Sequence, residues 1–377
     1  MTPEHHANPD LTVLADNKQG WNLPERRRHG FHNADRLWRR MFQCRARSVL
    51  TLHDRPDSAV ADAVQASGIT RHPAFSALVI AEGNRQLYGE AAADFATTQS
   101  HSIQSVTKMH AHLLLGELIA AGRVDPELAA GHYLPDLGPG YAQARIADLL
   151  DMTVINDFDE DYSNPFSACY AEEEALGWRL PADGRAEITL AAFTNAITGS
   201  AQRNTSGLAG YKSANTDVLT RIAAAVSPVY LATWLERVAD AAGYEGTFSI
   251  TLSPELLPAL SGGGCLSARD LARFGLLLAR RGAGLGGGQV GDAGFTAESL
   301  TRPAPKLSEG RYWLRYSRHL MTDGRRIGHA GYGGQYLMVD METGRVAAFL
   351  SVLENASGYD DDYMAGVIRA LETVLNA

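Results

Sequence analysis

The sequence predicts an α/β protein of the α+β kind, in which a central antiparallel sheet is flanked by helices and a helical domain is inserted in the middle of the chain. Three observations carry this prediction. Strand patterns occur early, at 75–89, and again late, at 310–353, whereas the residues between them are mainly helical. A closing helix follows at 363–375, with apolar residues at helical spacing. One sheet can take strands from both ends of a chain. The helical middle of the chain is therefore expected to be inserted between the early and the late strands of that sheet.

This pattern divides the chain into three parts. Residues 1–35 are expected to form a loop-rich N-terminal arm, with Trp21 as its anchor. Residues 36–100 and 295–377 are expected to form the antiparallel sheet with its terminal helix, and 101–294 the mainly helical region. A chain of 377 residues is long enough for one large domain or two smaller ones.

Composition narrows the functional classes. The chain is 45% hydrophobic and 20% charged, with a net charge of −9, which disfavours nucleic acid or an anionic membrane as the main partner. No apolar run is long enough to span a bilayer, and Met1 to Gly20 lacks the apolar core of a secretory signal, so a cytoplasmic location is expected. Cys44, Cys169 and Cys265 are far apart and odd in number. Buried thiols are therefore expected, with no disulfide framework, metal or organic cofactor.

The elements are expected in the following order. A strand at 75–82, a turn near Gly83-Asn84 and a second strand at 86–89 form a hairpin. Glycines dominate 282–294 and indicate a surface loop. Helical patterns occupy 109–122, 146–150, 190–197, 212–226 and 268–281, and late strand patterns occupy 310–316, 335–340 and 346–353.

The stretch Ser102 to Lys108 places a serine, Ser105, three residues before Lys108, at the start of the helical run 109–122. Residues i and i+3 share a helix face, so the two side chains would lie side by side in the first turn. A serine hydroxyl needs a neighbouring base to become a nucleophile. A lysine can be that base if its pKa is lowered, and both burial and the positive end of the helix dipole would lower it.

Two later stretches offer further parts for such a site. Tyr211 lies where a loop enters the helix at 212–226, and a tyrosinate or a hydrogen-bonded phenol there could relay a proton. The structural alternative is a half-buried tyrosine that caps the helix. The second stretch is 328–335, where small residues would let a backbone N–H approach a substrate and complete an oxyanion hole. Its structural alternative is a glycine-rich turn between strands.

In this order and at these separations, the three motifs resemble the penicillin-recognising serine enzymes, which include class C β-lactamases, D-alanyl-D-alanine peptidases and related esterases and amidases. The resemblance covers roughly 15–377 and implies the β-lactamase/DD-peptidase-like fold. Within the superfamily, the chain looks most similar to the nylon-oligomer (6-aminohexanoate-dimer) hydrolase and esterase branch. The resemblance to this branch is carried by the sequence blocks 211–219, 262–275, 329–335 and 159–162.

The resemblance implies roles for the catalytic residues. Ser105 would be the acylated nucleophile, Lys108 the base that activates it, and Tyr211 the partner in proton transfer. The backbone N–H groups of Ser105 and Tyr332 would form the oxyanion hole.

It also implies a substrate-binding set. Ser213 would take the place of an asparagine of β-lactamases, and Tyr162 would lie on a mobile loop that closes over the substrate. Gly331 would belong to the substrate-facing strand. His329 replaces the lysine of the Lys-Thr-Gly motif, whose charge helps to hold the carboxylate of β-lactams and peptides. A neutral or partly protonated histidine suggests esters or amides without a strict need for that carboxylate.

Other patterns are set aside. The match to G-x-G-x-x-G at 282–287 follows a helix and opens none, so dinucleotide binding is rejected. His110 and His112 point to different helix faces and are not expected to bind a metal. The acidic runs at 157–161 and 360–362 are expected to be solvated loops.

The sequence therefore predicts a serine hydrolase that cleaves a small-molecule amide or ester through an acyl-enzyme. An acyltransferase that uses the same acyl-enzyme stays open. So does a non-catalytic binding protein on the same scaffold, although intact Ser105, Lys108 and Tyr211 argue against it. The substrate and the oligomeric state, including a homodimer, are not fixed by the sequence.

Overall fold

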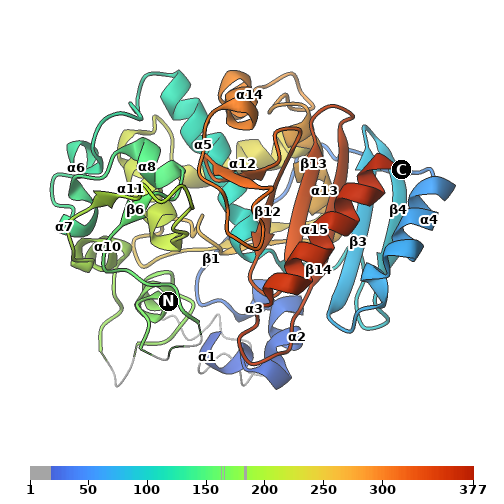
Figure 1. The fold of residues 1–377 in the computed structure, drawn as a ribbon, viewed down its shortest axis with the longest axis horizontal. Coiled ribbons are helices and arrows are strands. Elements are labelled where there is room, and N and C mark those ends of the chain that lie inside the picture. The colour runs from blue at the N-terminus through green and yellow to red at the C-terminus, as the bar shows by residue number, and fades with distance from the viewer. Residues whose placement is uncertain (1–17, 163, 165, 182–184) are drawn as a thin grey trace.

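A computed structural model describes residues 18–162, 164, 166–181 and 185–377; the expectations placed on 1–17 lie outside the described residues. The centre is an eight-stranded sheet with helices on both faces, and the mainly helical region lies beside it (Figure 1). The strand order is β10-β11-β12-β13-β14-β3-β4-β2. Neighbours are antiparallel except for β2 and β4. The predicted fold class, with strands from both ends of the chain in one sheet, is confirmed.

The pairing of β14 with β3 joins the late strands to the early hairpin, with Val346 opposite Ala81. The bounds of the strands are β2 His53–Asp54, β3 Phe75–Glu82, β4 Arg85–Ala91, β10 Arg315–Ser317, β11 Leu320–Thr322, β12 Arg326–Gly331, β13 Gln335–Asp340 and β14 Arg345–Ser351.

Alternation along β3 explains why both faces are covered. Successive side chains of a strand point to opposite faces. Leu78 and Ile80 belong to the apolar cluster of α4 (Ser58–Ser67) and α15 (Asp361–Asn376), whereas Val79 belongs to the cluster that contains α13 (Ala268–Ala279). In Figure 1, α15 crosses the face of the sheet that the viewer sees.

A second sheet, with strand order β1-β8-β9-β5, supports the helical region. Its strands are β1 Met41–Cys44, β5 His101–Ser102, β8 Phe248–Thr251 and β9 Gly264–Leu266; β6 Val154–Ile155 pairs with β7 Gln202–Arg203. The helices are α5 Lys108–Ala120, α6 Ala130–Tyr133, α7 Pro139–Ala142, α8 Ile146–Leu150, α9 Cys169–Ala175, α10 Leu190–Ala196, α11 Ser213–Val226, α12 Leu231–Ala242 and α14 Ala293–Thr301, with short 3₁₀ turns η3 Ile69–Arg71 and η4 Gln104–Thr107. Among the described residues, no single helix is long and apolar enough to cross a membrane; α11 and α12 qualify by length and composition only as a pair bent by 101°.

The described part of the N-terminal arm is helical, so the expectation of a loop-rich arm is wrong there. It forms α1 Lys18–Trp21, α2 Pro24–His32 and α3 Ala34–Leu37. Trp21 is fully buried, with its ring 5.9 Å from that of Phe31 and 5.2 Å from that of Trp38. Packing around Trp21, rather than apolar periodicity, fixes these short helices, and the sequence pattern therefore did not reveal them.

The other elements test the remaining predictions. The hairpin, the helices at 146–150, 190–196, 213–226 and 268–279, and the terminal helix are confirmed. The strand predicted at 310–316 begins only at Arg315, and α12 was not predicted. Cys44, Cys169 and Cys265 are buried and free, as predicted.

Candidate active site

Ser105 lies in a tight turn and not inside the α-helix that the sequence suggested. The 3₁₀ turn η4 carries it, and α5 begins only at Lys108. Gln104, the residue before it, has φ +46°, a left-handed conformation that costs about 1–2 kcal/mol for a residue with a Cβ. Gly264 of β9 holds this turn, because its carbonyl accepts from the Ile103 N–H at 3.0 Å and its own N–H donates to Thr107 Oγ1 at 3.1 Å.

Lys108 is completely buried, and its amino group makes three hydrogen bonds. The Nζ atom lies 3.1 Å from Ser105 Oγ and 2.9 Å from Ser213 Oγ, and it also donates to the backbone carbonyl of Ser261. These contacts bring together the serine and the lysine that the sequence placed side by side. They add Ser213 as a direct partner of the lysine.

Burial lowers the pKa of Lys108, because the interior disfavours the charged ammonium. The carboxyl groups of Glu160, Glu172 and Asp217 oppose this shift. Glu172 and Asp217 are themselves buried, and burial raises the pKa of both carboxyls. The nearby charge of Asp217 raises the pKa of Glu172 further, whereas hydrogen bonds with Glu172 and Ser261 counter part of the rise in the pKa of Asp217. The pKa of Lys108 is lowered overall, which increases the share of the neutral amine. The neutral amine is the form that can accept a proton from Ser105.

Glu160 was assigned to a solvated acidic loop, and for this residue the prediction is wrong. Its carboxylate accepts from the Ser213 backbone N–H at 2.6 Å, from Ser213 Oγ at 2.8 Å and from the Tyr162 hydroxyl at 2.8 Å. Ser213 is the first residue of α11, so Glu160 satisfies a backbone donor that a helix leaves free at its start. The glutamate is therefore directed inward, onto a partner of Lys108.

Tyr211 lies two residues before α11 and faces the same group of side chains. Lys108 Nζ is 4.9 Å from the centroid of its ring. Burial and the Glu160 carboxylate raise the pKa of the phenol well above its usual value, and the hydroxyls of Ser105 and Ser213 counter part of this rise. The phenol, not the tyrosinate, is therefore the form present at neutral pH. Among the described residues, its buried hydroxyl has no hydrogen-bond partner with good geometry, although the Ser105 and Ser213 hydroxyls lie close enough to affect its pKa.

A pocket of about 320 Å³ opens beside Ser105. Its walls combine aromatic, apolar and charged side chains. They are Ser105, Glu160, Tyr162, Tyr211, Leu307, Ser308, Arg311, Met321, Ala330, Gly331, Tyr332 and Tyr359. Arg311 donates to the Tyr359 hydroxyl at 2.6 Å and to Asp361 at 3.0 Å, so its charge is already paired.

The N-terminal helix braces one wall of this pocket. The Lys18 ammonium forms a buried ion pair with Glu173 and lies 5.5, 4.8 and 5.4 Å from the ring centroids of Tyr162, Trp178 and Tyr332. Cation–π contacts of this kind are worth about 0.5–2 kcal/mol each. The position of Tyr162 over the pocket therefore depends on a residue far away in the sequence.

His329 lies behind the pocket wall. Its ring is fully buried, with Nδ1 2.7 Å from the Ala330 carbonyl and Nε2 3.1 Å from the Tyr316 hydroxyl. Burial lowers the pKa of the imidazole well below its usual value, so the ring is neutral. His329, which was predicted to bind substrate, is a residue of β12 (Arg326–Gly331) and is not among the residues that line the pocket.

The end of β12 passes very close to the Ser105 turn. A Cβ on Gly331 would lie 2.6 Å from the carbonyl oxygen of Ile103 and 2.6 Å from Gln335 Oε1. Only glycine allows this approach. Ser105 and Tyr332, whose backbone N–H groups were predicted as an oxyanion hole, both line the pocket at this point.

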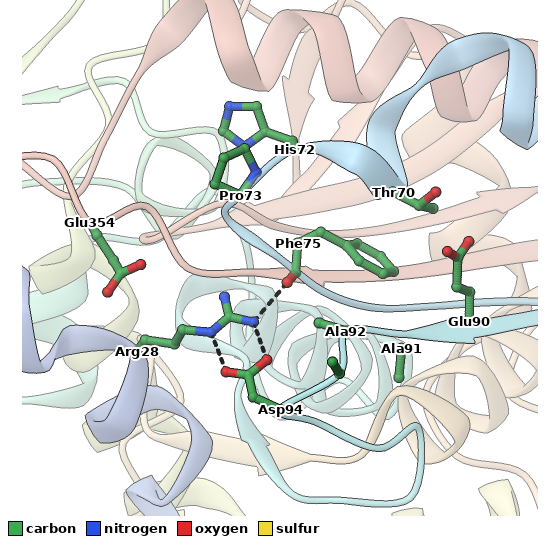
Figure 2. A pocket seen from close by; sticks show the side chains of 11 residues that line it. Arg28, Thr70, His72, Pro73, Phe75, Glu90, Ala91, Ala92, Asp94 and Glu354 are labelled. Atoms are coloured by element: carbon green, nitrogen blue, oxygen red, sulfur yellow. Dashed lines mark hydrogen bonds and ion pairs between the residues drawn. The ribbon is translucent and has the colours of Figure 1, made fainter.

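A second hollow, of about 480 Å³, lies elsewhere on the surface (Figure 2). Figure 2 shows the Arg28 guanidinium held by Asp94 and by the Phe75 carbonyl, at 2.6–2.9 Å, with Glu90 and Glu354 to either side. The described residues that line this hollow include no serine, cysteine or lysine, so it holds no counterpart of the Ser105–Lys108 pair. The pocket beside Ser105 is therefore the candidate active site.

Comparison with known proteins agrees with this geometry. The family model described as Beta-lactamase matches residues 60–368, which include Ser105, Lys108, Tyr211 and Gly331. The chain belongs to the β-lactamase family. A relative from Paenarthrobacter ureafaciens named 6-aminohexanoate-dimer hydrolase is 30% identical over 322 residues, 79% of each chain.

Several solved structures share the fold. A protein from Bacillus anthracis described as a 6-aminohexanoate-dimer hydrolase has a TM-score of 0.77 at 14% identity and covers 96% of each chain. A hydrolase with promiscuous acyltransferase activity has a TM-score of 0.60 at 16% identity, over 83% of this chain and 98% of its own. A D-stereospecific amidohydrolase from Streptomyces sp. has a TM-score of 0.58 at 17% identity, over 82% and 98%. The chain is thus a serine hydrolase with the β-lactamase fold.

Sequence reasoning missed several groups at this site. Glu172, Asp217 and the carbonyl of Ser261 surround Lys108, and Lys18 supports Tyr162. No local pattern marks them, since each reaches the site from a different part of the chain. Glu160 carried the one usable signal, which was its place two residues before Tyr162 in the block 159–162.

Proposed function

We propose that the protein cleaves an amide or ester bond of a small molecule through an acyl-enzyme on Ser105. The observation that carries the proposal is the buried Lys108 amine, hydrogen-bonded at 3.1 Å to Ser105 Oγ. A buried amine with a lowered pKa can take the serine proton as Oγ attacks the carbonyl carbon.

The next step is collapse of the tetrahedral intermediate. Its oxyanion would accept hydrogen bonds from the backbone N–H groups of Ser105 and Tyr332. The Tyr211 phenol would give its proton to the leaving nitrogen or oxygen, and the Lys108 ammonium would replace that proton. The carbon–leaving-group bond then breaks and leaves the acyl group on Ser105. Attack by water, by the reverse proton path, would release the acid and restore the serine.

The pocket supports small neutral or linear substrates. Leu307, Met321 and Ala330 offer apolar contact, and the one arginine in the lining, Arg311, is paired with Asp361. A neutral, buried His329 supplies no charge for a substrate carboxylate. The name of the relative from Paenarthrobacter ureafaciens makes linear amides of aminohexanoate the first compounds to test.

A hydrolysis screen tests the proposal. p-Nitrophenyl esters, linear amides, D-amino acid amides and a chromogenic cephalosporin would be compared, with Ser105→Ala as the control. Turnover of an ester or amide that disappears in Ser105→Ala supports the proposal, and equal turnover by both proteins contradicts it. Adding an alcohol or amine to the reaction separates hydrolysis from acyl transfer, because a transferase would convert the acceptor into a new ester or amide.

A further inference from the structure

Which atoms donate and which accept in the hydrogen bonds around the Lys108 amine depends on Glu160. A neutral lysine amine has two N–H donors and one lone pair. Of its three partners, the Ser261 carbonyl can only accept, so it takes one N–H. Ser213 and Ser105 are hydroxyls, and each could either donate to the amine or accept from it.

Glu160 removes this ambiguity for Ser213. The Ser213 hydroxyl donates to Glu160 Oε1 at 2.8 Å, and its backbone N–H donates to Oε2 at 2.6 Å. Because its only hydrogen is committed, Ser213 Oγ can serve Lys108 only as an acceptor. Both N–H groups of the neutral amine are then used, and its lone pair is left for the hydroxyl of Ser105.

We propose that Glu160 is a positioning residue, which directs the lone pair of Lys108 to Ser105 by holding the hydrogen of Ser213. The inference rests on the proposed function of Ser105 and Lys108. Without Glu160, the Ser213 hydroxyl can turn and donate to the amine, and Ser105 then competes with it for one lone pair. Since the Tyr162 hydroxyl also donates to Glu160, at 2.8 Å, the orientation of the base depends on the segment that carries Tyr162 over the pocket.

The charge of Glu160 provides a second readout. The ionisable groups that face Lys108 are the carboxyls of Glu160, Glu172 and Asp217 and the buried rings of Tyr211, His319 and His329. Replacing a carboxylate by an amide removes a negative charge that favours the ammonium. The pH midpoint of acylation should therefore move down in Glu160→Gln, which loss of a purely structural contact would not cause.

The experiment measures the rate at which a fluorophosphonate labels Ser105, from pH 5 to pH 9, in four proteins: the unchanged chain, Glu160→Gln, Ser213→Ala and the double variant. We expect Glu160→Gln to slow the high-pH plateau rate at least 10-fold in the unchanged background and less than 2-fold in Ser213→Ala, where no hydroxyl is left to turn. Glu255→Gln is the matched control, since Glu255 accepts from the Leu190 and Ala191 N–H groups at the start of α10, far along the chain from Lys108.

The possible outcomes distinguish failure of the positioning role of Glu160 from failure of the proposed function of Ser105. An equal effect of Glu160→Gln in both backgrounds, or none in either, would overturn the positioning role while Ser105 labelling in the unchanged chain upheld the proposed function. No adduct on Ser105 in the unchanged chain would overturn both. A loss of rate in Glu255→Gln as large as in Glu160→Gln would assign the effect to helix capping and also reject the positioning role.

Discussion

The amino nitrogen of Lys108 lies 3.1 Å from the hydroxyl oxygen of Ser105, close to the carboxyl groups of Glu160, Glu172 and Asp217. Burial lowers the pKa of the lysine, and those carboxyls limit how far it falls. In the proposed mechanism, this balance sets the pH at which Ser105 becomes reactive.

This relationship predicts the pH dependence of acylation. Because the base must be neutral, the rate should rise with pH, with a midpoint below 10.5, the ordinary pKa of a lysine. Lys108→Met keeps the length of the side chain but removes the base, and should slow acylation by about 10²–10⁴-fold. Stopped-flow measurement with an activated ester checks both, with circular dichroism to verify folding. A midpoint at or above 10.5, or an unchanged rate in Lys108→Met, would contradict the role of the lysine.

Tyr162 should matter more for amides than for activated esters. Its hydroxyl donates to Glu160 and its ring packs 5.0 Å from that of Tyr332 above the pocket. Amide cleavage needs the leaving nitrogen to be protonated inside a closed site, whereas an activated phenolate leaves unaided. Tyr162→Phe should therefore lower kcat for a linear amide several-fold more than kcat for a p-nitrophenyl ester. Equal losses for both substrates would argue against this role.

Gly331 should tolerate no side chain. A Cβ there would lie 2.6 Å from the Ile103 carbonyl and would push β12 away from the Ser105 turn. Loss of one oxyanion donor costs about 10²–10³ in kcat, so Gly331→Ala should fall in that range. Gly366→Ala in α15 is the control, because its Cβ would meet nothing within 4 Å and activity should not change. Full activity in Gly331→Ala would show that the backbone of Tyr332 is not needed.

Buried histidines should make the fold sensitive to acid. Burial lowers the pKa of His110 and His112 to about 4 and that of His319 to about 3, against 6.5 in an unfolded chain. Between pH 6.5 and these values the unfolded chain binds more protons, so the free energy of unfolding falls as the pH drops, by up to about 1.4 kcal/mol per pH unit for each histidine.

His110 offers the cleanest check, because its ring stacks 4.1 Å from that of Phe274. Urea unfolding of the unchanged chain and of His110→Phe, at pH 7, 6 and 5, gives the slope of stability against pH. The variant should show a smaller slope, with a difference that grows toward a limit of about 1.4 kcal/mol per pH unit at the acid end of this range. Identical slopes would mean that His110 is not held neutral.

The sequence predicted those parts of the fold that have a clear apolar periodicity within a single helix or strand. The hairpin β3–β4 and the helix α15 have clear periodicity and were placed within about two residues. The second sheet had no such signal, since its strands span two to four residues and pair across the chain, as Met41 does with Thr251. Pairing at that separation is decided by tertiary packing, which a local pattern does not contain.

The contacts of the candidate active site also fall into two groups, those between residues near in sequence and those between distant residues. Ser105 and Lys108 are three residues apart, so their contact could be predicted from local geometry alone. The contact between Glu160 and Ser213 spans 53 residues and that between Lys18 and Glu173 spans 155. Such contacts depend on how segments that are far apart in the chain pack together, and only the structure reveals them.

Acylation of Ser105 can be detected by intact-protein mass spectrometry. After exposure to a fluorophosphonate or an activated ester, we expect one adduct per chain, on Ser105, and none in Ser105→Ala. An adduct on another residue, or no adduct in the unchanged protein, would contradict it.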